Sequence, residues 1–247
     1  MYIMIEEKIT YTCSRCGSPN IVRNGHNKCG NPQYRCKDCN AYRVLKPKQL
    51  HPPRTRQQVL KAYRERMSLR GVERVFGVCR QTVMTWLQDD VQSLPSLFDT
   101  LLPAQEHDVL ELDEAWSFVG KKIDKRWLWT VLCRRTRQII AFVIGDRSEE
   151  TCEQLWQAIP DAYRHCHSFS DFWKAYANVF PPSTHQSVGK ETGETAHQER
   201  WYNTLRQWLG RYTRKTLSFS KLDFYHELVT RWFILEHNLR MLSSLTT

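Results

Sequence analysis

The chain has 247 residues, a formal net charge of +10 and a pI near 9.2. Its hydrophobic share of 41% is enough to bury a core, which excludes a wholly disordered chain. The longest apolar runs, such as Ile139 to Ile144, are far shorter than the ~20 residues that cross a bilayer. The first ten residues contain Glu6 and Glu7 and lack the apolar stretch of a secretory signal. We therefore expect a cytoplasmic protein with no membrane partner.

The positive charge is concentrated in the first part of the chain. Residues 1–107 hold 17 Lys and Arg against 9 Asp and Glu, whereas residues 108–247 hold 19 against 17. Basic side chains that neutralise phosphates release counterions and so gain affinity for a polyanion. The front half therefore favours a nucleic-acid surface, and simple solubility is the alternative.

Four of the nine cysteines form two pairs, Cys13-Ser-Arg-Cys16 and Cys36-Lys-Asp-Cys39, separated by 19 residues. This spacing is typical of a tetrahedral zinc site whose four thiolates leave no position open for catalysis. We expect a structural zinc ribbon over residues 1–46, with short strands at 21–26 and 33–35. A disulfide framework is the weaker alternative, and Cys29 fits neither pair.

A proline-rich linker is expected at residues 47–53, followed by a helix-turn-helix domain at 54–92. Apolar periodicity predicts helices at 55–66, 69–76 and 80–87, with Gly77 in the tight turn. The small core of this helix-turn-helix domain is expected to contain Val72, Val75, Val78, Val83 and Trp86. The third helix then presents Arg80, Gln81 and Thr85 to a DNA major groove. A generic helical hairpin is the alternative.

A connector at residues 93–107 leads to a domain at 108–247 with a different pattern. Three strands are expected first, then a helix and a further strand. The three strands are expected at 109–120, 126–133 and 138–145, the helix at 147–159 and the further strand at 165–170. This order is that of a ribonuclease H-like α/β domain, a mixed five-stranded sheet with flanking helices.

The order of strands gives a meaning to three carboxylates. In such a core the first and fourth strands are neighbours, so Asp113 in one meets Asp171 at the end of the other. Glu199, which opens an amphipathic helix, completes a site for two Mg²⁺ or Mn²⁺ ions that act on a phosphodiester. Arg206 follows two turns later on the same helix face. Glu114 points to the opposite face of a regular strand and is expected to lie outside the site.

Spacing alone is weak support for this trio, because a segment with 17 acidic residues yields some plausible triple by chance. Four basic residues near Glu199 are expected to follow DNA phosphates, with a solvated helix face as the alternative. These residues are Arg200, Arg211, Arg214 and Lys215. His197 is expected to be a loop or capping histidine, and an auxiliary catalytic role is the alternative.

These motifs together resemble the transposases of the insertion sequence one family. The resemblance rests on Leu112-Asp113-Glu-x-Trp116, Ser170-Asp171-x-Trp173-x-x-Tyr176, Glu199-Arg-x-x-Asn203-x-Leu-Arg206-Gln207 and Arg214 to Lys221, and covers nearly the whole chain. It implies that Asp113, Asp171 and Glu199 form the acidic triad of the DDE superfamily, followed by Arg206. Phe172 departs from the glycine that the family usually has after the second aspartate.

The resemblance also implies an activity. Such an enzyme binds the terminal inverted repeats of an insertion sequence in double-stranded DNA and catalyses Mg²⁺-dependent 3′-end cleavage and strand transfer. Bringing two ends together implies at least a homodimer, associated with a bacterial nucleoid. A zinc-ribbon and helix-turn-helix repressor with an inactive nuclease domain is the alternative, and a structure-directed nuclease such as a ribonuclease H is a second one.

Overall fold

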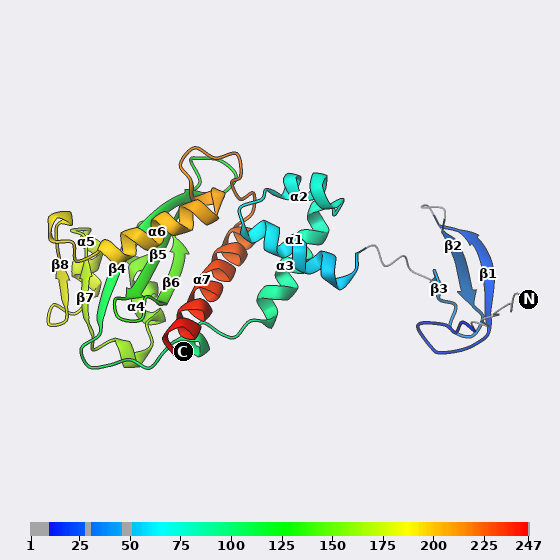
Figure 1. The fold of residues 1–247 in the computed structure, drawn as a ribbon, viewed down its shortest axis with the longest axis horizontal. Helices are drawn as coiled ribbons and strands as arrows, with labels where there is room; N and C mark the ends of the chain where they lie inside the picture. Colours follow the sequence, from blue (N-terminus) through cyan, green and yellow to red (C-terminus); the bar gives the residue numbers. More distant parts are fainter. Residues whose placement is uncertain (1–9, 28–30, 46–50, 247) are drawn as a thin grey trace, which may run out of the picture. The chain divides into compact units, whose positions relative to one another are not determined.

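The computed structural model describes residues 10–27, 31–45 and 51–246 of the chain (Figure 1). It consists of two compact units, residues 1–52 and 53–247, and each is described here by itself. Cys29 and residues 47–50 of the expected linker lie outside the described residues.

The first unit is a small antiparallel sheet with the strand order β1-β2-β3. Its strands are β1 (Ile21–His26), β2 (Pro32–Cys36) and β3 (Tyr42–Arg43). The two longer strands confirm the expected ribbon, and the two-residue β3 was not anticipated. The buried apolar core of the described part consists of Cys13, Cys36 and Ala41, which is too small to stabilise a fold unaided.

The second unit begins with three short helices. They are α1 (Pro53–Arg64), α2 (Leu69–Phe76) and α3 (Arg80–Ser93). Ser68 caps α2 by accepting a hydrogen bond from the Gly71 amide, and Gly77 ends it with a φ of 67°. Val59, Val72, Val78 and Val83 form the small core between the helices. Val75 was expected there but is 65% exposed, because its helix turns that position outward.

A mixed five-stranded sheet with the order β6-β5-β4-β7-β8 forms the centre of the unit. Its strands are β4 (Val109–Phe118), β5 (Lys125–Cys133), β6 (Ile139–Gly145), β7 (His167–Ser170) and β8 (His185–Ser187). The first three are antiparallel, and β7 lies parallel to β4 on its other side. The expected sheet and the expected contact between the first and fourth strands are confirmed.

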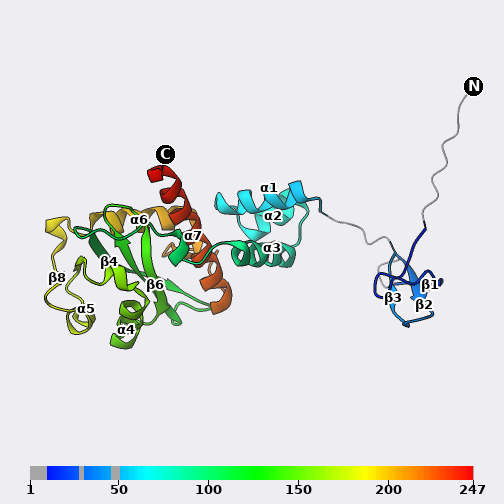
Figure 2. The same ribbon diagram turned by 90° about the horizontal axis from the view of Figure 1, so that it is seen from below.

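Helices cover both faces of this sheet (Figure 2). One face packs on α4 (Glu149–Ala158) and α5 (Lys174–Val179), together with Leu110 and Leu112 of β4. The other packs on α6 (Ala196–Trp208) and α7 (Asp223–Thr246), together with Ala115 of β4. Short 3₁₀ helices lie at Phe98–Thr100, Asp161–Tyr163, Lys190–Thr192 and Gly210–Tyr212.

Two of the three N-terminal helices of this unit, α1 and α3, pack directly against α7. Arg64 of α1 forms ion pairs with Asp90 of α3 at 3.2 Å and with Glu236 of α7 at 2.8 Å. Its guanidinium also lies 4.8 Å from the ring centre of Trp232. Arg211 donates to the Tyr63 hydroxyl at 2.8 Å, which joins α1 to the segment after α6. The position of α3 relative to the sheet is therefore fixed by packing within the unit.

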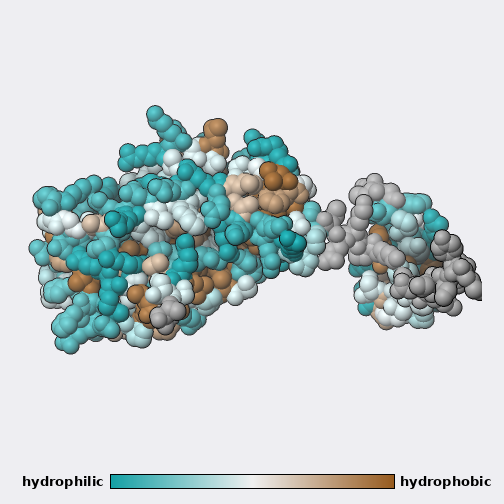
Figure 3. All heavy atoms as spheres, viewed as in Figure 1, coloured by the Kyte–Doolittle hydropathy of each residue, from teal (hydrophilic) through white to brown (hydrophobic). Residues whose placement is uncertain are grey.

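The surface gives two further facts. Among the described helices, none has a stretch of apolar residues sufficient to span a bilayer. On the face shown in Figure 3, a group of apolar residues lies over the region of α2, and apolar residues elsewhere on the second unit are scattered among hydrophilic ones.

Candidate active site

The four expected cysteines converge in the first unit. All four Sγ atoms lie within 4.8 Å of one another, and two of the Sγ pairs, Cys13 with Cys39 and Cys16 with Cys36, are 3.6 Å apart. Tetrahedral zinc with Zn–S bonds of about 2.3 Å places its sulfurs about 3.8 Å apart, so the cluster fits that ion. Backbone N–H groups of Arg15 and Cys16 lower the pKa of Cys13 to about 6, which favours the thiolate that a metal needs.

In the second unit, two of the expected carboxylates meet at an open edge of β4. The parallel pairing of β4 with β7 ends at Glu111 and Phe169, and the chain leaves β7 at Asp171. Beyond that point the β7 side of β4 has no neighbouring strand, so side chains can bend around the edge. The carboxylates of Asp113, Glu114 and Asp171 consequently lie within 4.8 Å of one another.

The two aspartates are held by backbone hydrogen bonds. Asp113 Oδ1 accepts from the Glu114 amide at 2.7 Å, and Asp171 Oδ1 accepts from the Trp173 amide at 2.9 Å. Burial, together with the charges of Asp171 and Glu199, raises the pKa of Asp113 to about 6. A carboxyl held in this way is stabilised in its charged form by a cation beside it.

Glu114 lies beside the two aspartates, closer to them than the expectation from strand alternation implied. The regular register of β4 with β5 does turn its side chain to the face opposite Asp113, as expected. At the open edge, however, its carboxylate reaches back to those of Asp113 and Asp171. Burial raises the pKa of Glu114 to about 8, while the Arg147 guanidinium at 3.4 Å lowers it.

Glu199 lies near this group but is not part of the 4.8 Å cluster. It is exposed in the first turn of α6, and its charge contributes to the raised pKa of Asp113. Arg206 lies seven residues further along the helix, a rise of about 10 Å. Its guanidinium contacts Asn203 and lies 5.8 Å from the ring centre of Tyr202.

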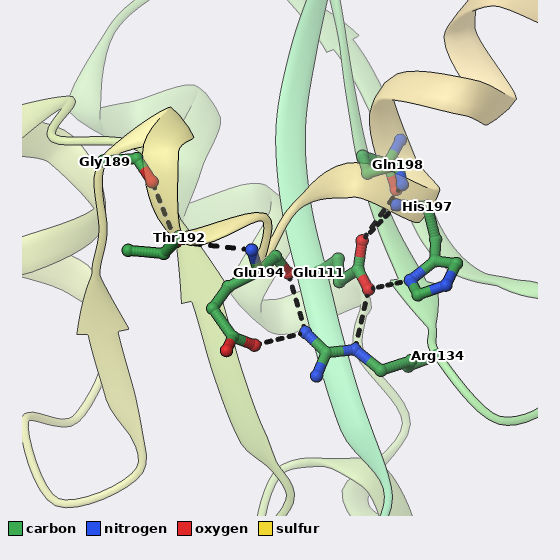
Figure 4. Close-up of polar contacts among 7 residues, drawn as sticks. All are labelled: Glu111, Arg134, Gly189, Thr192, Glu194, His197 and Gln198. Atoms are coloured by element: carbon green, nitrogen blue, oxygen red, sulfur yellow. Dashed lines mark hydrogen bonds and ion pairs between the residues drawn. The ribbon is translucent and has the colours of Figure 1, made fainter.

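A buried network places α6, and with it Glu199, against the sheet (Figure 4). Glu111 accepts hydrogen bonds from the first-turn amides of His197 at 2.9 Å and Gln198 at 3.0 Å. These helical N–H groups have no intrahelical partner, and Thr195 at the N-cap makes no side-chain bond to them. The carboxylate of Glu111 thus caps α6 from a neighbouring strand, where the helix dipole also favours a negative charge.

The same network contains Arg134. Its Nε donates to Glu111 at 2.8 Å, and a terminal nitrogen donates to Glu194 at 2.7 Å. His197 Nδ1 lies 2.6 Å from Glu111, so this histidine is part of the helix start. The sequence reading missed Glu111 and Arg134 as contributors to the site. The available signal was that Glu111 is two residues before Asp113, on the same strand face.

The residues expected to contact DNA fall into two groups. Most are solvent-exposed, and among them Arg80 forms an ion pair with Glu73 at 3.3 Å. The exposed ones are Arg80, Gln81 and Thr85 on α3, Arg200 on α6, and Arg214 and Lys215. Arg211 is half-buried and donates to Ser220, to the Tyr225 carbonyl and to Tyr63. Its role in DNA binding stays a prediction, and its observed contacts are with the protein itself.

Comparison with known proteins identifies the family. The family model described as IS1 transposase matches residues 108–240, which include the whole carboxylate cluster and α6. The chain belongs to the IS1 transposase family. This membership confirms the expected relationship and makes the chain a nucleic-acid-processing enzyme of the transposase class.

Individual relatives agree with this assignment. The chain is 37% identical over 131 residues to the iso-IS1n protein InsB of Shigella dysenteriae, covering 52% of this chain and 95% of that protein. It is 31% identical over 128 residues to the IS1 protein InsB of Shigella flexneri, covering 51% and 95%. It is also 28% identical over 159 residues to the IS1 1 protein InsB of Escherichia coli K12, covering 62% and 93%.

Zinc removal tests the cysteine cluster. Because the described core of the first unit is so small, we expect the segment 10–45 to unfold when a chelator removes zinc. The second unit has its own large cores and should keep its unfolding transition. Limited proteolysis with mass spectrometry checks both, and a segment 10–45 that stays protected without metal would contradict the assignment.

The capping role of Glu111 is tested by Glu111→Ala. This change leaves Arg134 and two helix amides without a buried partner, so we expect a loss of about 3 to 5 kcal/mol in unfolding free energy. The matched control is Glu194→Ala, because Glu194 pairs with the same arginine but is 36% exposed and should cost about 1 kcal/mol or less. Urea unfolding measures both, and equal losses would argue against the cap.

The raised pKa of Asp113 predicts that Asp113→Asn increases the free energy of unfolding in a pH-dependent way. The pKa of this carboxyl rises to about 6 on folding, so the folded state holds its proton more tightly than the unfolded state does. The stability that this gives is present at low pH and is lost as the pH rises through 6. Without added Mg²⁺, the variant should therefore be more stable than the parent by about 1 to 2 kcal/mol at pH 8. At pH 4 the two should be equal. Urea unfolding of zinc-loaded protein at both pH values measures the difference, and a gain independent of pH would contradict the assigned cause.

Proposed function

We propose that this chain is a DNA transposase that binds the terminal inverted repeats of an insertion sequence and catalyses Mg²⁺-dependent 3′-end cleavage and strand transfer. The observation that carries the proposal is the meeting of Asp113 and Asp171 at the open edge of β4, near enough to Glu199 for its charge to act on Asp113. In this proposal the domain is ribonuclease H-like and spans residues 108–247.

The donor set fits Mg²⁺ or Mn²⁺, since these ions prefer carboxylate oxygens and the site offers several at close range. Asp113, Asp171 and Glu199 would hold the ions. Bound there, a pair of divalent ions activates the attacking oxygen and stabilises the leaving oxygen of a phosphodiester. The cap by Glu111 and the hydrogen bonds to the two aspartates keep the carboxylates oriented before metal arrives.

Other residues would hold the DNA. In this proposal the domain at 54–92 is a helix-turn-helix, whose Arg80, Gln81 and Thr85 read base edges in the major groove. Basic residues after Glu199 contact phosphates, among them the exposed Arg200 directly after it and the half-buried Arg206 about 10 Å further along α6. These residues are Arg200, Arg206, Arg214 and Lys215.

The remaining parts of the chain have structural roles in this proposal. The ribbon at 1–46 holds zinc through Cys13, Cys16, Cys36 and Cys39, and the linker at 47–53 joins it to the helix-turn-helix. The connector at 93–107 leads into the catalytic domain, and two or more copies act together on paired ends at the nucleoid.

Neutral variants of the triad test the proposal. Asp113→Asn, Asp171→Asn and Glu199→Gln should each reduce end cleavage and strand transfer by more than about a hundredfold, because loss of even a supporting partner of a metal ligand costs up to that factor. Binding to end DNA should stay nearly intact, since it is assigned to residues outside the triad. Cleavage and transfer of labelled end DNA in Mg²⁺ are measured beside a gel-shift assay.

Asp161→Asn is the matched control, because Asp161 is 91% exposed and lies in a separate 3₁₀ helix of the same domain. It should leave both reactions unchanged. Normal strand transfer by any one of the three triad variants would remove that residue from the metal-binding set.

A further inference from the structure

A single arginine lies among the carboxylates of the site. Arg147, just before α4, places its terminal nitrogen NH2 3.4 Å from Glu114 Oε2 and 3.9 Å from Asp171 Oδ2. Both distances are longer than those of close charge-assisted hydrogen bonds, so the guanidinium is shared between the two acids. It lies where it can balance negative charge at the edge of the metal-binding group.

Arg147 is held in this position by aromatic rings. Its guanidinium carbon lies 4.8 Å from the ring centre of Trp127 on β5 and 4.1 Å from that of Trp173, which follows Asp171. Contacts of a guanidinium with two indole faces are favourable, and more so when partly shielded from water. The side chain is 33% exposed, and its Nε is buried with no hydrogen-bond partner among the described residues. The cation is thus fixed by stacking more than by hydrogen bonds.

Glu114 needs that cation more than Asp171 does. Its side chain is 2% exposed, whereas that of Asp171 is 41% exposed. An ionised carboxylate this deeply buried is costly unless a partner compensates it. Among the described residues, Glu114 Oε1 has no hydrogen-bond partner, so Arg147 on Oε2 carries the compensation. Asp171 can instead exchange Arg147 for water or for a metal ion.

We propose that Arg147 is a positioning residue of the metal site, which keeps Glu114 as its lasting partner and holds Asp171 only until a divalent cation binds. This rests on the proposed function, in which the same carboxylates bind Mg²⁺. Arg147 then keeps Glu114 out of the coordination sphere and keeps Asp171 close to Asp113 in the metal-free enzyme. Metal binding replaces one cation beside Asp171 with another.

The competing arrangement makes Glu114 a direct metal ligand, since its carboxylate lies within 4.8 Å of both aspartates. The two arrangements differ in how Glu114 and Arg147 are coupled. Suppose that Arg147 competes with metal for Asp171. Removing the carboxylate of Glu114 then leaves Asp171 as the one acidic partner of Arg147 in this group, so their ion pair becomes stronger and metal binding becomes weaker. Removing Arg147 as well then reverses the loss. If Glu114 is a ligand, no change at Arg147 replaces the missing oxygen.

A double-mutant cycle on the zinc-loaded full-length protein tests this. Binding of Mn²⁺ is followed by the loss of the free-ion electron paramagnetic resonance signal, in degassed buffer at pH 8.5. We expect Glu114→Gln to weaken Mn²⁺ binding about tenfold and Arg147→Gln to strengthen it. The double variant should bind at least as tightly as the parent. Arg147→Lys, which keeps the charge, should stay within about threefold of the parent.

Two results would overturn the proposal. A double variant that binds Mn²⁺ as weakly as Glu114→Gln makes Glu114 a ligand. Single changes that leave the affinity untouched remove any coupling between Arg147 and the metal. Thermal unfolding without Mn²⁺ identifies variants that fail to fold. If Arg147→Gln fails to fold, Arg147→Met takes its place in the cycle, because it also removes the charge and keeps an unbranched side chain between the two indole rings. Asp113→Asn separates this test from the proposed function, because unchanged Mn²⁺ binding by that variant would reject the carboxylate site itself.

Discussion

The arrangement of the site depends on where one strand pairing ends. The parallel ladder between β4 and β7 stops at Glu111 and Phe169, while the antiparallel ladder with β5 continues along β4 as far as Phe118. One side of β4 is therefore rigidly paired and the other is open for the half of the strand that carries Asp113 and Glu114. Strand alternation sends Glu111 and Asp113 to the α6 face and Glu114 to the α4 face. The open edge then lets carboxylates from both faces approach Asp171.

Several buried carboxylates close together repel one another and lose their hydration, and the partners that compensate for this differ from one carboxylate to the next. Glu111 is fully buried but receives two helix amides, a histidine and an arginine. Glu114 is buried with one stretched arginine contact. Asp113 accepts from one backbone amide, and its burial, together with the charges of Asp171 and Glu199, raises its pKa to about 6. Glu111, which caps α6, therefore has several partners, whereas Glu114 and Asp113 beside the proposed metal site have few, as expected when stability is exchanged for function.

The sequence was sufficient for what depends on local pattern and strand order. The apolar periodicities located the longer helices and strands but not β3, α5 or β8, and the strand order correctly placed Asp113 beside Asp171. It was not sufficient for contacts that depend on side chains between distant elements. That Glu114 would bend around an unpaired edge depends on where the β7 ladder stops, and no local pattern reports that. Val75 was misplaced because a helix of eight residues has too few positions for its apolar face to be unambiguous.

The structure also shows which basic side chains have their charge paired within the fold. Arg64, Arg134, Arg147 and Arg211 are all partly buried and bound to acids, aromatic rings or hydroxyls of the protein. They hold α1 to α7, close the start of α6 and balance the carboxylate cluster, so their charge is already used within the fold. Arg200, Arg214 and Lys215 are instead exposed, and their contact with a polyanion stays a prediction. Loss of a phosphate contact lowers the salt dependence of binding, whereas loss of an internal pair lowers stability. Arg64 and Arg211 thus join α1 to α3, to α7 and to the segment after α6 within one compact unit.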